Sequence, residues 1–335
     1  MSGTDLLQKT PFAAAMADLP LCCLDVGSRG GMEPDLLPAA FAIDAVGFEP
    51  DQAECDRLNR EADGPWRSAR FLPTALAGGS GSRTLYRALD PVSSSLLPPV
   101  PATGKRFNQE SYCTIVDQSP LETLGLDEAI DGFGLSAPDY LKLDTEGSEL
   151  EILRGGERAL ATVSVIKTEV GFMTFRDGQP PARALDDFLS ERGFELVALI
   201  SPAHWRRHGH VLHPRVSRES IPYSRGQLAQ SDFLYMRHPD GFALEGADRD
   251  TIAARRLKAA WLAMIYGYFD RAEEYLADSD ATRLLRERWR LEAGEALRLA
   301  SQISGRAAWR RALVQHMRGL VPLLRNGPTA LSRRP

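Results

Sequence analysis

Cysteine is scarce in this chain, and its few copies fit neither a disulfide framework nor a metal site. The 335 residues include four cysteines: Cys22, Cys23, Cys55 and Cys113. Two are adjacent within an apolar run and the other two stand alone, so no pair has the spacing of a zinc motif. We therefore expect reduced thiols, as is usual in the cytoplasm.

Long apolar runs and a strong charge of one sign are also missing. No run approaches the roughly 20 apolar residues that cross a bilayer, and residues 1–12 have no apolar core with a basic flank that would mark a secretory signal. The formal net charge of -5 gives no general reason to expect nucleic acid as a partner. We expect a soluble, cytoplasmic protein that is long enough to bury a sizeable core.

What the sequence does contain is an alternation of strand-like and helix-like segments. Leu21–Val26 is apolar until Asp25, as expected for a strand that is buried on both faces. Ser148 and Glu151 have the spacing of a capping box at the start of a helix. Further strands are predicted at 45–48, 71–76, 140–143, 163–170, 194–200 and 232–236, helices at 51–62, 148–160 and 182–192, and loops with hairpin pieces at 82–118. This order predicts an α/β fold with a doubly wound, mostly parallel sheet.

The character of the sequence changes near residue 240. From there alanine, leucine, arginine and glutamate dominate, with helical spacing over 249–277, 281–303 and 306–321. We therefore divide the chain into an α/β domain at 1–240 and a helical C-terminal domain at 241–335.

A glycine-rich turn, LDVGSRGG at residues 24–31, follows the first predicted strand. Glycine lets the backbone turn tightly and approach a ligand closely. Asp25 can accept a hydrogen bond from an ammonium group, and Glu49, at the end of the next strand, has the place of an acid that binds ribose hydroxyls. Arg29 and Met32 stand where a dinucleotide fingerprint needs glycine. The pattern indicates a nucleoside with a cationic tail, and an ordinary turn without a ligand is the alternative.

A second run, DYLKLDTEGSELEILRG at residues 139–155, places Asp144 and Glu146 just past the end of a predicted strand. Open α/β sheets bind ligands outside the carboxyl ends of their strands, near the switch in strand order. Both acids are therefore candidates to face a ligand. The alternatives are that Asp144 only orients its turn and that Glu146 is solvated.

These two runs, together with GFEPD, AL, SSL and KTEV at 47–51, 75–76, 94–96 and 167–170, resemble the FkbM family of class I methyltransferases over about residues 20–237. The resemblance implies a Rossmann-like sheet of seven strands whose last strand is antiparallel, with S-adenosyl-L-methionine bound across the first two strands. The cofactor-binding residues that it implies are Asp25, Gly27, Ser28, Glu49, Ala75 and Asp144. At the turn, Ser28 and Arg29 replace the smaller residues that are common there.

The resemblance also implies a reaction, because members of this family mostly methylate hydroxyl groups of sugars, polyketides and glycans. We expect O-methyl transfer to a sugar or glycan-type acceptor; a polyketide or peptide acceptor and a catalytically silent docking module are the alternatives. Asp144 is the first candidate for the base that removes the hydroxyl proton, and Glu169 is the second. No residue is assigned to a metal, although a divalent metal at these two acids is left open.

Candidate acceptor contacts lie in two segments. Ser94 and Ser95 belong to the family resemblance, and the insertion at 203–213 holds four of the six histidines. In this insertion Trp205 could stack on a sugar and His208 could contact it, while the arginines could hold an anionic group. A metal site made of imidazoles and a solvated loop are the alternatives.

The C-terminal end is basic and amphipathic. Residues 296–335 contain eight arginines and no acid. Within 306–321, one helical face carries Trp309, Leu313, Met317 and Leu320. Such a helix can lie on an anionic membrane surface, which would place the protein at the inner face of a membrane. The commoner role of such a helix is packing on its own domain or on a second subunit, which would give a homo-oligomer.

Overall fold

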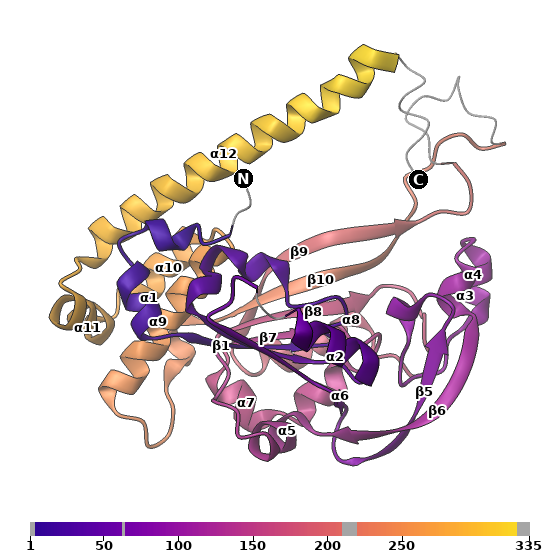
Figure 1. Cartoon of the computed structure of the whole chain (residues 1–335), viewed down its shortest axis with the longest axis horizontal. Helices are drawn as coiled ribbons and strands as arrows, with labels where there is room; N and C mark the ends of the chain where they lie inside the picture. The colour runs from indigo at the N-terminus through magenta and orange to yellow at the C-terminus, as the bar shows by residue number, and fades with distance from the viewer. Residues whose placement is uncertain (1–3, 62–63, 210–219, 327–335) are drawn as a thin grey trace.

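The chain folds around a seven-stranded sheet (Figure 1). The computed structural model describes residues 4–61, 64–209 and 220–326, with side chains described as far as Val314. The strand order is β3-β2-β1-β7-β8-β10-β9. The strands are β1 (Leu21–Val26), β2 (Ile43–Phe48), β3 (Ser68–Leu72), β7 (Tyr140–Leu143), β8 (Val165–Gly171), β9 (Phe194–Trp205) and β10 (Gln227–Arg237).

The direction of the strands confirms the predicted fold class. Neighbouring strands from β3 to β8 are parallel. The last strand, β10, runs antiparallel to both of its neighbours, β8 and β9. This is a doubly wound α/β sheet of seven strands with an antiparallel last strand, as the sequence predicted. All six residues of β1 are buried, as expected of the central strand.

A second, smaller sheet follows β3. It has the order β4-β6-β5 and consists of β4 (Ala75–Leu76), β5 (Gly81–Ala88) and β6 (Ile115–Leu124). The expected strand at 71–76 is therefore two strands, which Pro73 separates because proline cannot donate a hydrogen bond to a sheet. The short helices α3 (Pro101–Arg106) and α4 (Glu110–Cys113) connect β5 to β6, where loops and hairpin pieces were expected.

The helix predicted at 148–160 is also divided. It forms α6 (Glu149–Arg154) and α7 (Glu157–Thr162), with Gly155 and Gly156 between them. A Cβ atom on Gly156 would lie 2.6 Å from the side chain of Leu126, so the break allows close packing against α5 (Leu126–Gly132). The predicted capping box is wrong, because Ser148 makes no capping hydrogen bond and its Oγ has no partner among the described residues.

Helices cover both faces of the sheet. One hydrophobic cluster packs α5 to α7 and α8 (Ala182–Ser190) against β1, β7 and β8. The other cluster lies on the opposite face and combines N-terminal with C-terminal helices. Its helices are η1 (Leu7–Lys9), α1 (Ala13–Asp18), η2 (Pro34–Ala42), η5 (Pro239–Phe242), α9 (Arg249–Ile265), α10 (Phe269–Leu276), α11 (Ser279–Trp289) and the beginning of α12 (Ala293–Asn326). This second cluster contains residues from both sides of residue 240, where the sequence analysis divided the chain. The division into two domains stays a prediction.

The last helix, α12 (Ala293–Asn326), differs from the helices predicted at 281–303 and 306–321. The chain breaks earlier, at Arg290, which has a left-handed conformation with φ 57°, and then continues as one helix. In the described part of the chain, no helix combines the length and the apolar character that crossing a membrane requires. All four cysteines are free and buried.

Candidate active site

A cavity of about 200 Å³ opens at the carboxyl ends of β1, β2 and β7. The strand order reverses at β1, which lies between β2 and β7. Open α/β sheets bind their ligands at such a switch point. Seven residues that the sequence singled out line this cavity: Gly27, Glu49, Ala75, Ser94, Ser95, Asp144 and Glu146. Other lining residues were not expected, among them Arg29, Arg87 and Lys142.

The turn after β1 lies directly against the end of β7. Gly27 has φ +82°, and a Cβ atom there would lie 1.9 Å from the carbonyl oxygen of Asp144. The amides of Gly27 and Ser28 both donate to the carbonyl of Phe48 at the end of β2. The turn therefore joins three strand ends, and it leaves bare backbone on the cavity wall, as a close approach to a ligand requires.

Asp25 and Ser28 lie behind this wall. Asp25 is 1% exposed and accepts a hydrogen bond from the amide of Glu33. Burial raises the pKa of Asp25 to about 6, although Lys142 opposes the shift. The Lys142 ammonium lies 3.2 Å from Asp25 and 3.4 Å from Asp144, so it bridges the two acids. Asp25 is thus connected to the cavity through Lys142, and the predicted cofactor contacts of Asp25 and Ser28 stay predictions.

Glu49 lies on the opposite wall and is buried. It accepts a hydrogen bond from the amide of Asp51, and burial raises its pKa. The guanidinium group of Arg29 lies 3.8 Å from Glu49 and 3.6 Å from Asp51. The unusual arginine in the glycine turn therefore neutralises the acid that was predicted to bind ribose. A ligand that reaches Glu49 has to share it with this side chain or displace it.

The loop that follows β7 is held by a carboxylate of its own. Glu149 accepts hydrogen bonds from the amides of Thr145 and Gly147 and from the Thr145 hydroxyl. Glu146 adopts a left-handed conformation with φ +59°, which is uncommon outside glycine. Sequence analysis did not single out Glu149, although an acid two residues beyond a glycine is a visible sign of such a loop.

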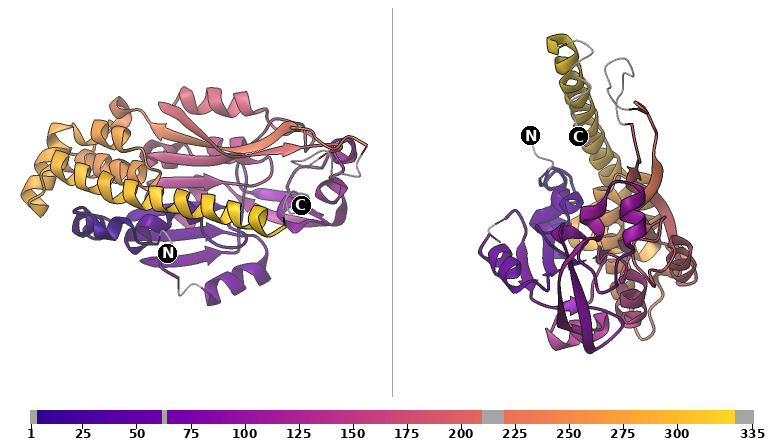
Figure 2. Two further views of the ribbon diagram at one scale, coloured as in Figure 1. Left: turned by 90° about the horizontal axis from the view of Figure 1, so that it is seen from above. Right: turned by 90° about the vertical axis from the view of Figure 1, so that its right-hand side faces the viewer.

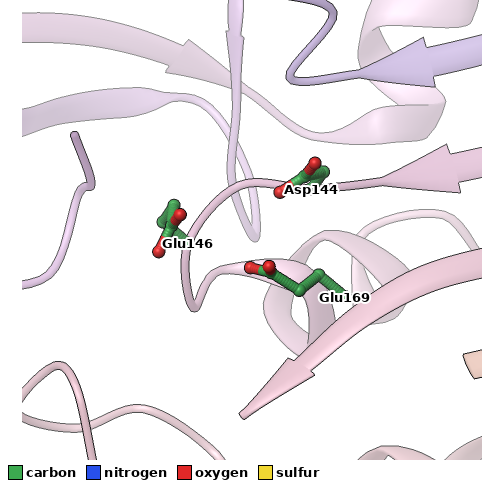
Figure 3. Close-up of side chains that lie close together, drawn as sticks. All are labelled: Asp144, Glu146 and Glu169. Atoms are coloured by element: carbon green, nitrogen blue, oxygen red, sulfur yellow. The ribbon is translucent and has the colours of Figure 1, made fainter. Parts of the chain in front are cut away.

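Three carboxylates meet beside this loop. Figure 3 shows Asp144, Glu146 and Glu169 around a common space, with carboxylate oxygens within 4.8 Å of one another. Tyr112 donates its hydroxyl to Glu146, and Arg176, which is almost fully buried, lies 3.2 Å from the same carboxylate. These partners come from distant parts of the sequence.

The burial of two of these acids sets their charge. Burial raises the pKa of Glu146 to about 8, and this effect outweighs the opposite effect of Arg176. Burial, together with the charge of Glu146, raises the pKa of Glu169 well above its ordinary value. Both shifts favour the protonated form of these acids over the charged form. Asp144, whose side chain is 39% exposed, is the member of the cluster that faces the cavity most openly.

The same cluster offers oxygen ligands that a divalent cation could use. Each carboxylate already has a partner in the protein: Lys142 for Asp144, Arg176 for Glu146, and Gln230, which donates to Glu169 at 2.6 Å. A cation would have to displace the buried Arg176 or take its place. The donor set therefore fits a paired acid cluster better than a resident metal, and we derive no step through a metal.

The other predicted acceptor residues have different environments. Ser95 donates to the carbonyl of Glu146, and Ser94 accepts from the amide of Ala88, so both serines hold the cavity wall in place. Trp205 packs edge-on against three rings, with ring centroids 4.8–6.1 Å apart, and does not line the cavity. His208 is exposed and does not line it either. Their roles stay predictions, and His210 and His213 lie outside the described residues.

The strand order is the one that the resemblance to class I S-adenosylmethionine-dependent methyltransferases implied, and the cavity lies at its switch point. Residues 32–196 match the family model described as Methyltransferase FkbM domain. This confirms the resemblance that the sequence motifs indicated.

Two characterised relatives align with this region. The 2-O-methyltransferase NoeI of Sinorhizobium fredii is 27% identical over 182 residues, which are 52% of this chain and 72% of the relative. The hexuronic acid methyltransferase AglP of Haloferax volcanii is 27% identical over 147 residues, or 44% of this chain. The match spans 54% of that relative, just over half of its length.

Two solved structures are similar as well. A methyltransferase FkbM from Methylobacillus flagellatus has a TM-score of 0.37 and 13% identity, over 65% of this chain and 44% of its own. A TehB-like S-adenosylmethionine-dependent methyltransferase from Corynebacterium glutamicum has a TM-score of 0.27 and 15% identity, over 68% of this chain and 92% of its own.

Proposed function

We propose that this protein transfers the methyl group of S-adenosylmethionine to a hydroxyl group of a sugar or glycan-type acceptor. One observation carries the proposal: a single cavity joins the bare turn at Gly27 and the buried acid Glu49 with the exposed carboxylate of Asp144. The turn at Gly27 and the acid Glu49 are suited to binding a nucleoside. The carboxylate of Asp144 is suited to accepting a proton from the acceptor hydroxyl. The names of NoeI and AglP describe methyl transfer to oxygen and to a sugar, which supports this choice of acceptor.

The cofactor would lie across the ends of β1 and β2. Glu49 would bind the ribose hydroxyls once Arg29 has moved aside, and Ala75 would leave room for the base. The amino-acid tail of the cofactor carries one positive and one negative charge. Lys142 lies between the carboxylates of Asp25 and Asp144. This end of the cavity therefore has a positive group beside negative ones.

S-adenosylmethionine supplies a methyl group that is already activated on a sulfonium sulfur. The protein has to place the acceptor oxygen in line with the methyl group and remove the hydroxyl proton. Positioning of this kind contributes up to roughly 7–11 kcal/mol in favourable cases, and a general base contributes about 10²–10⁴-fold. Asp144 would take the proton as the new C–O bond forms and the C–S bond breaks. Glu169, whose raised pKa favours the protonated form, would donate a hydrogen bond to the acceptor.

The proposal is tested in two steps with the full chain. Titration calorimetry with S-adenosylmethionine should show binding to one site per chain. Incubation with isotopically labelled cofactor and a panel of sugars, extracted glycans, polyketides and peptides should then give a methylated sugar or glycan, and mass spectrometry would show the label on oxygen. Cofactor binding without any methylated sugar, together with a methylated polyketide or peptide, would overturn the proposed acceptor class. Absence of cofactor binding would indicate a silent module.

A further inference from the structure

The final helix has a packed beginning and a remainder that extends beyond it. Ala296, Leu297 and Ala300 are buried against the C-terminal helices. Beyond them α12 continues to Asn326, which at 1.5 Å per residue adds about 39 Å. Figures 1 and 2 show this part leaving the body of the molecule rather than lying on it. We call residues 301–326 the distal arm.

The described side chains of the distal arm combine exposed apolar groups with cations. Trp309 is 66% exposed, Leu313 is 45% exposed and Val314 is 48% exposed. Trp309 and Leu313 are four residues apart and so share one helix face. Arg306, Arg310 and Arg311 are also exposed, and in the part of the chain that the structure describes they form no ion pair with an acid. The combination of a large aromatic with unpaired guanidinium groups is typical of helices that lie in a membrane interface.

We propose that the distal arm docks the protein on an anionic lipid surface. Charge carries the argument. The sequence from residue 296 to 335 contains eight arginines and no acid, although the whole chain has a net charge of -5. The molecule as a whole would be repelled by an anionic bilayer, so attraction has to come from this segment. The apolar face would enter the acyl boundary while the arginines meet the headgroup phosphates.

The same observations disfavour two other binding partners of the arm, a second copy of the chain and a nucleic acid. A second copy of the arm lying alongside the first would bring arginines together without an acid to neutralise them. A nucleic acid would neutralise the arginines, but its phosphate backbone offers no apolar surface for Trp309 and Leu313. An anionic bilayer satisfies both kinds of side chain at once.

Vesicle flotation with the full chain tests the proposal. The protein should float with vesicles of phosphatidylglycerol and phosphatidylcholine in equal parts, should not float with phosphatidylcholine alone, and should be released as salt is raised. Arg310→Glu with Arg311→Glu should weaken the partition about tenfold or more. The matched control is Arg60→Glu with Arg183→Glu, which changes the net charge equally at two exposed arginines of α2 (Gln52–Arg60) and α8. This control should bind almost as the wild type does.

A second readout follows the apolar face directly. Lipids with brominated acyl chains quench tryptophans that enter the bilayer, and the chain has five tryptophans. Trp309→Phe keeps an apolar ring, so it should keep vesicle binding while removing most of the quenching. Trp309→Ser with Leu313→Ser should lose binding, with circular dichroism showing that the fold is intact.

Three results would overturn the proposal. The first is no flotation with anionic vesicles at low salt. The second is equal loss of binding in the Arg60/Arg183 control. The third is a dimer in light scattering without lipid that the Trp309/Leu313 variant abolishes, because the arm would then bind a second copy of the chain. None of these measurements depends on methyl transfer, so they are independent of the proposed function.

Discussion

The α-carbon of Gly27 faces the carbonyl oxygen of Asp144 so closely that a Cβ atom would lie 1.9 Å from that oxygen. This contact joins the cofactor turn to the strand end that carries the candidate base. The two halves of the active site are therefore positioned by one backbone contact, and any side chain at residue 27 would separate them.

Gly27→Ala should accordingly destabilise the protein and weaken cofactor binding. The substitution costs about 1–2 kcal/mol for the left-handed conformation and about 1–3 kcal/mol more for the steric clash with β7. Gly30→Ala is the matched control, because Gly30 has φ +87° but nothing lies within 4 Å of its Cβ position. Thermal unfolding should show the larger loss for Gly27→Ala. Equal losses would mean that the contact with Asp144 has no structural role.

Glu49→Gln should weaken the binding of S-adenosylmethionine about ten- to a hundredfold. Hydrogen bonds to a charged group contribute about 1.5–3 kcal/mol, and the amide keeps the size of the side chain while removing its charge. Glu61→Gln, at an exposed position at the end of α2, should bind as the wild type does. Calorimetry measures both variants. Unchanged affinity in Glu49→Gln would remove this acid from the ribose site.

The stability of the protein should fall as pH rises towards 8 and beyond. The folded state raises the pKa of Glu146 from 4.5 to about 8, so between these values it holds a proton that the unfolded chain has released. The stabilisation that this proton brings is lost as pH rises through about 8. Glu146→Gln has no proton to lose. Its melting temperature relative to the wild type should therefore increase from about pH 6 to about pH 9, and a constant difference would contradict the raised pKa.

Much of the fold could be predicted from the sequence because the signals are local. The buried strand β1 is apolar along its length, and the turn after it contains the glycines that its positive φ angles require. The run around Asp144 likewise carries its own loop-forming residues. Patterns of this kind identify strands, turns and a candidate cofactor site without knowledge of any distant contact.

The remaining features depend on contacts between distant residues, which spacing does not show. The break at Gly156 exists because Leu126 packs there, and the pKa of Glu146 depends on its burial among Tyr112 and Arg176. The carboxylate of Asp25 accepts from the amide of Glu33 and pairs with Lys142, contacts that the spacing does not show, and its predicted cofactor contact stays a prediction. Each of these features depends on residues that are close in the folded structure and far apart in the sequence.

Methyl transfer should survive removal of divalent metals. Arg176 forms an ion pair with Glu146, and Gln230 donates a hydrogen bond to Glu169. These carboxylates therefore have partners without a cation. Activity after dialysis against EDTA should match the untreated enzyme, and added Mg²⁺ should not change it. Loss of activity with EDTA and recovery with Mg²⁺ would instead make the three acids a metal site.

The most direct test compares the turnover of Asp144→Asn with that of Glu169→Gln in the methyl-transfer assay at neutral pH. Asp144→Asn should lose about 10²–10⁴-fold in turnover, because the base is gone, and far less in cofactor affinity. Glu169→Gln should lose far less, since the amide still donates the hydrogen bond that the protonated acid provides. Full turnover in Asp144→Asn would contradict the account, because the cavity would then hold no base where the acceptor hydroxyl has to lie.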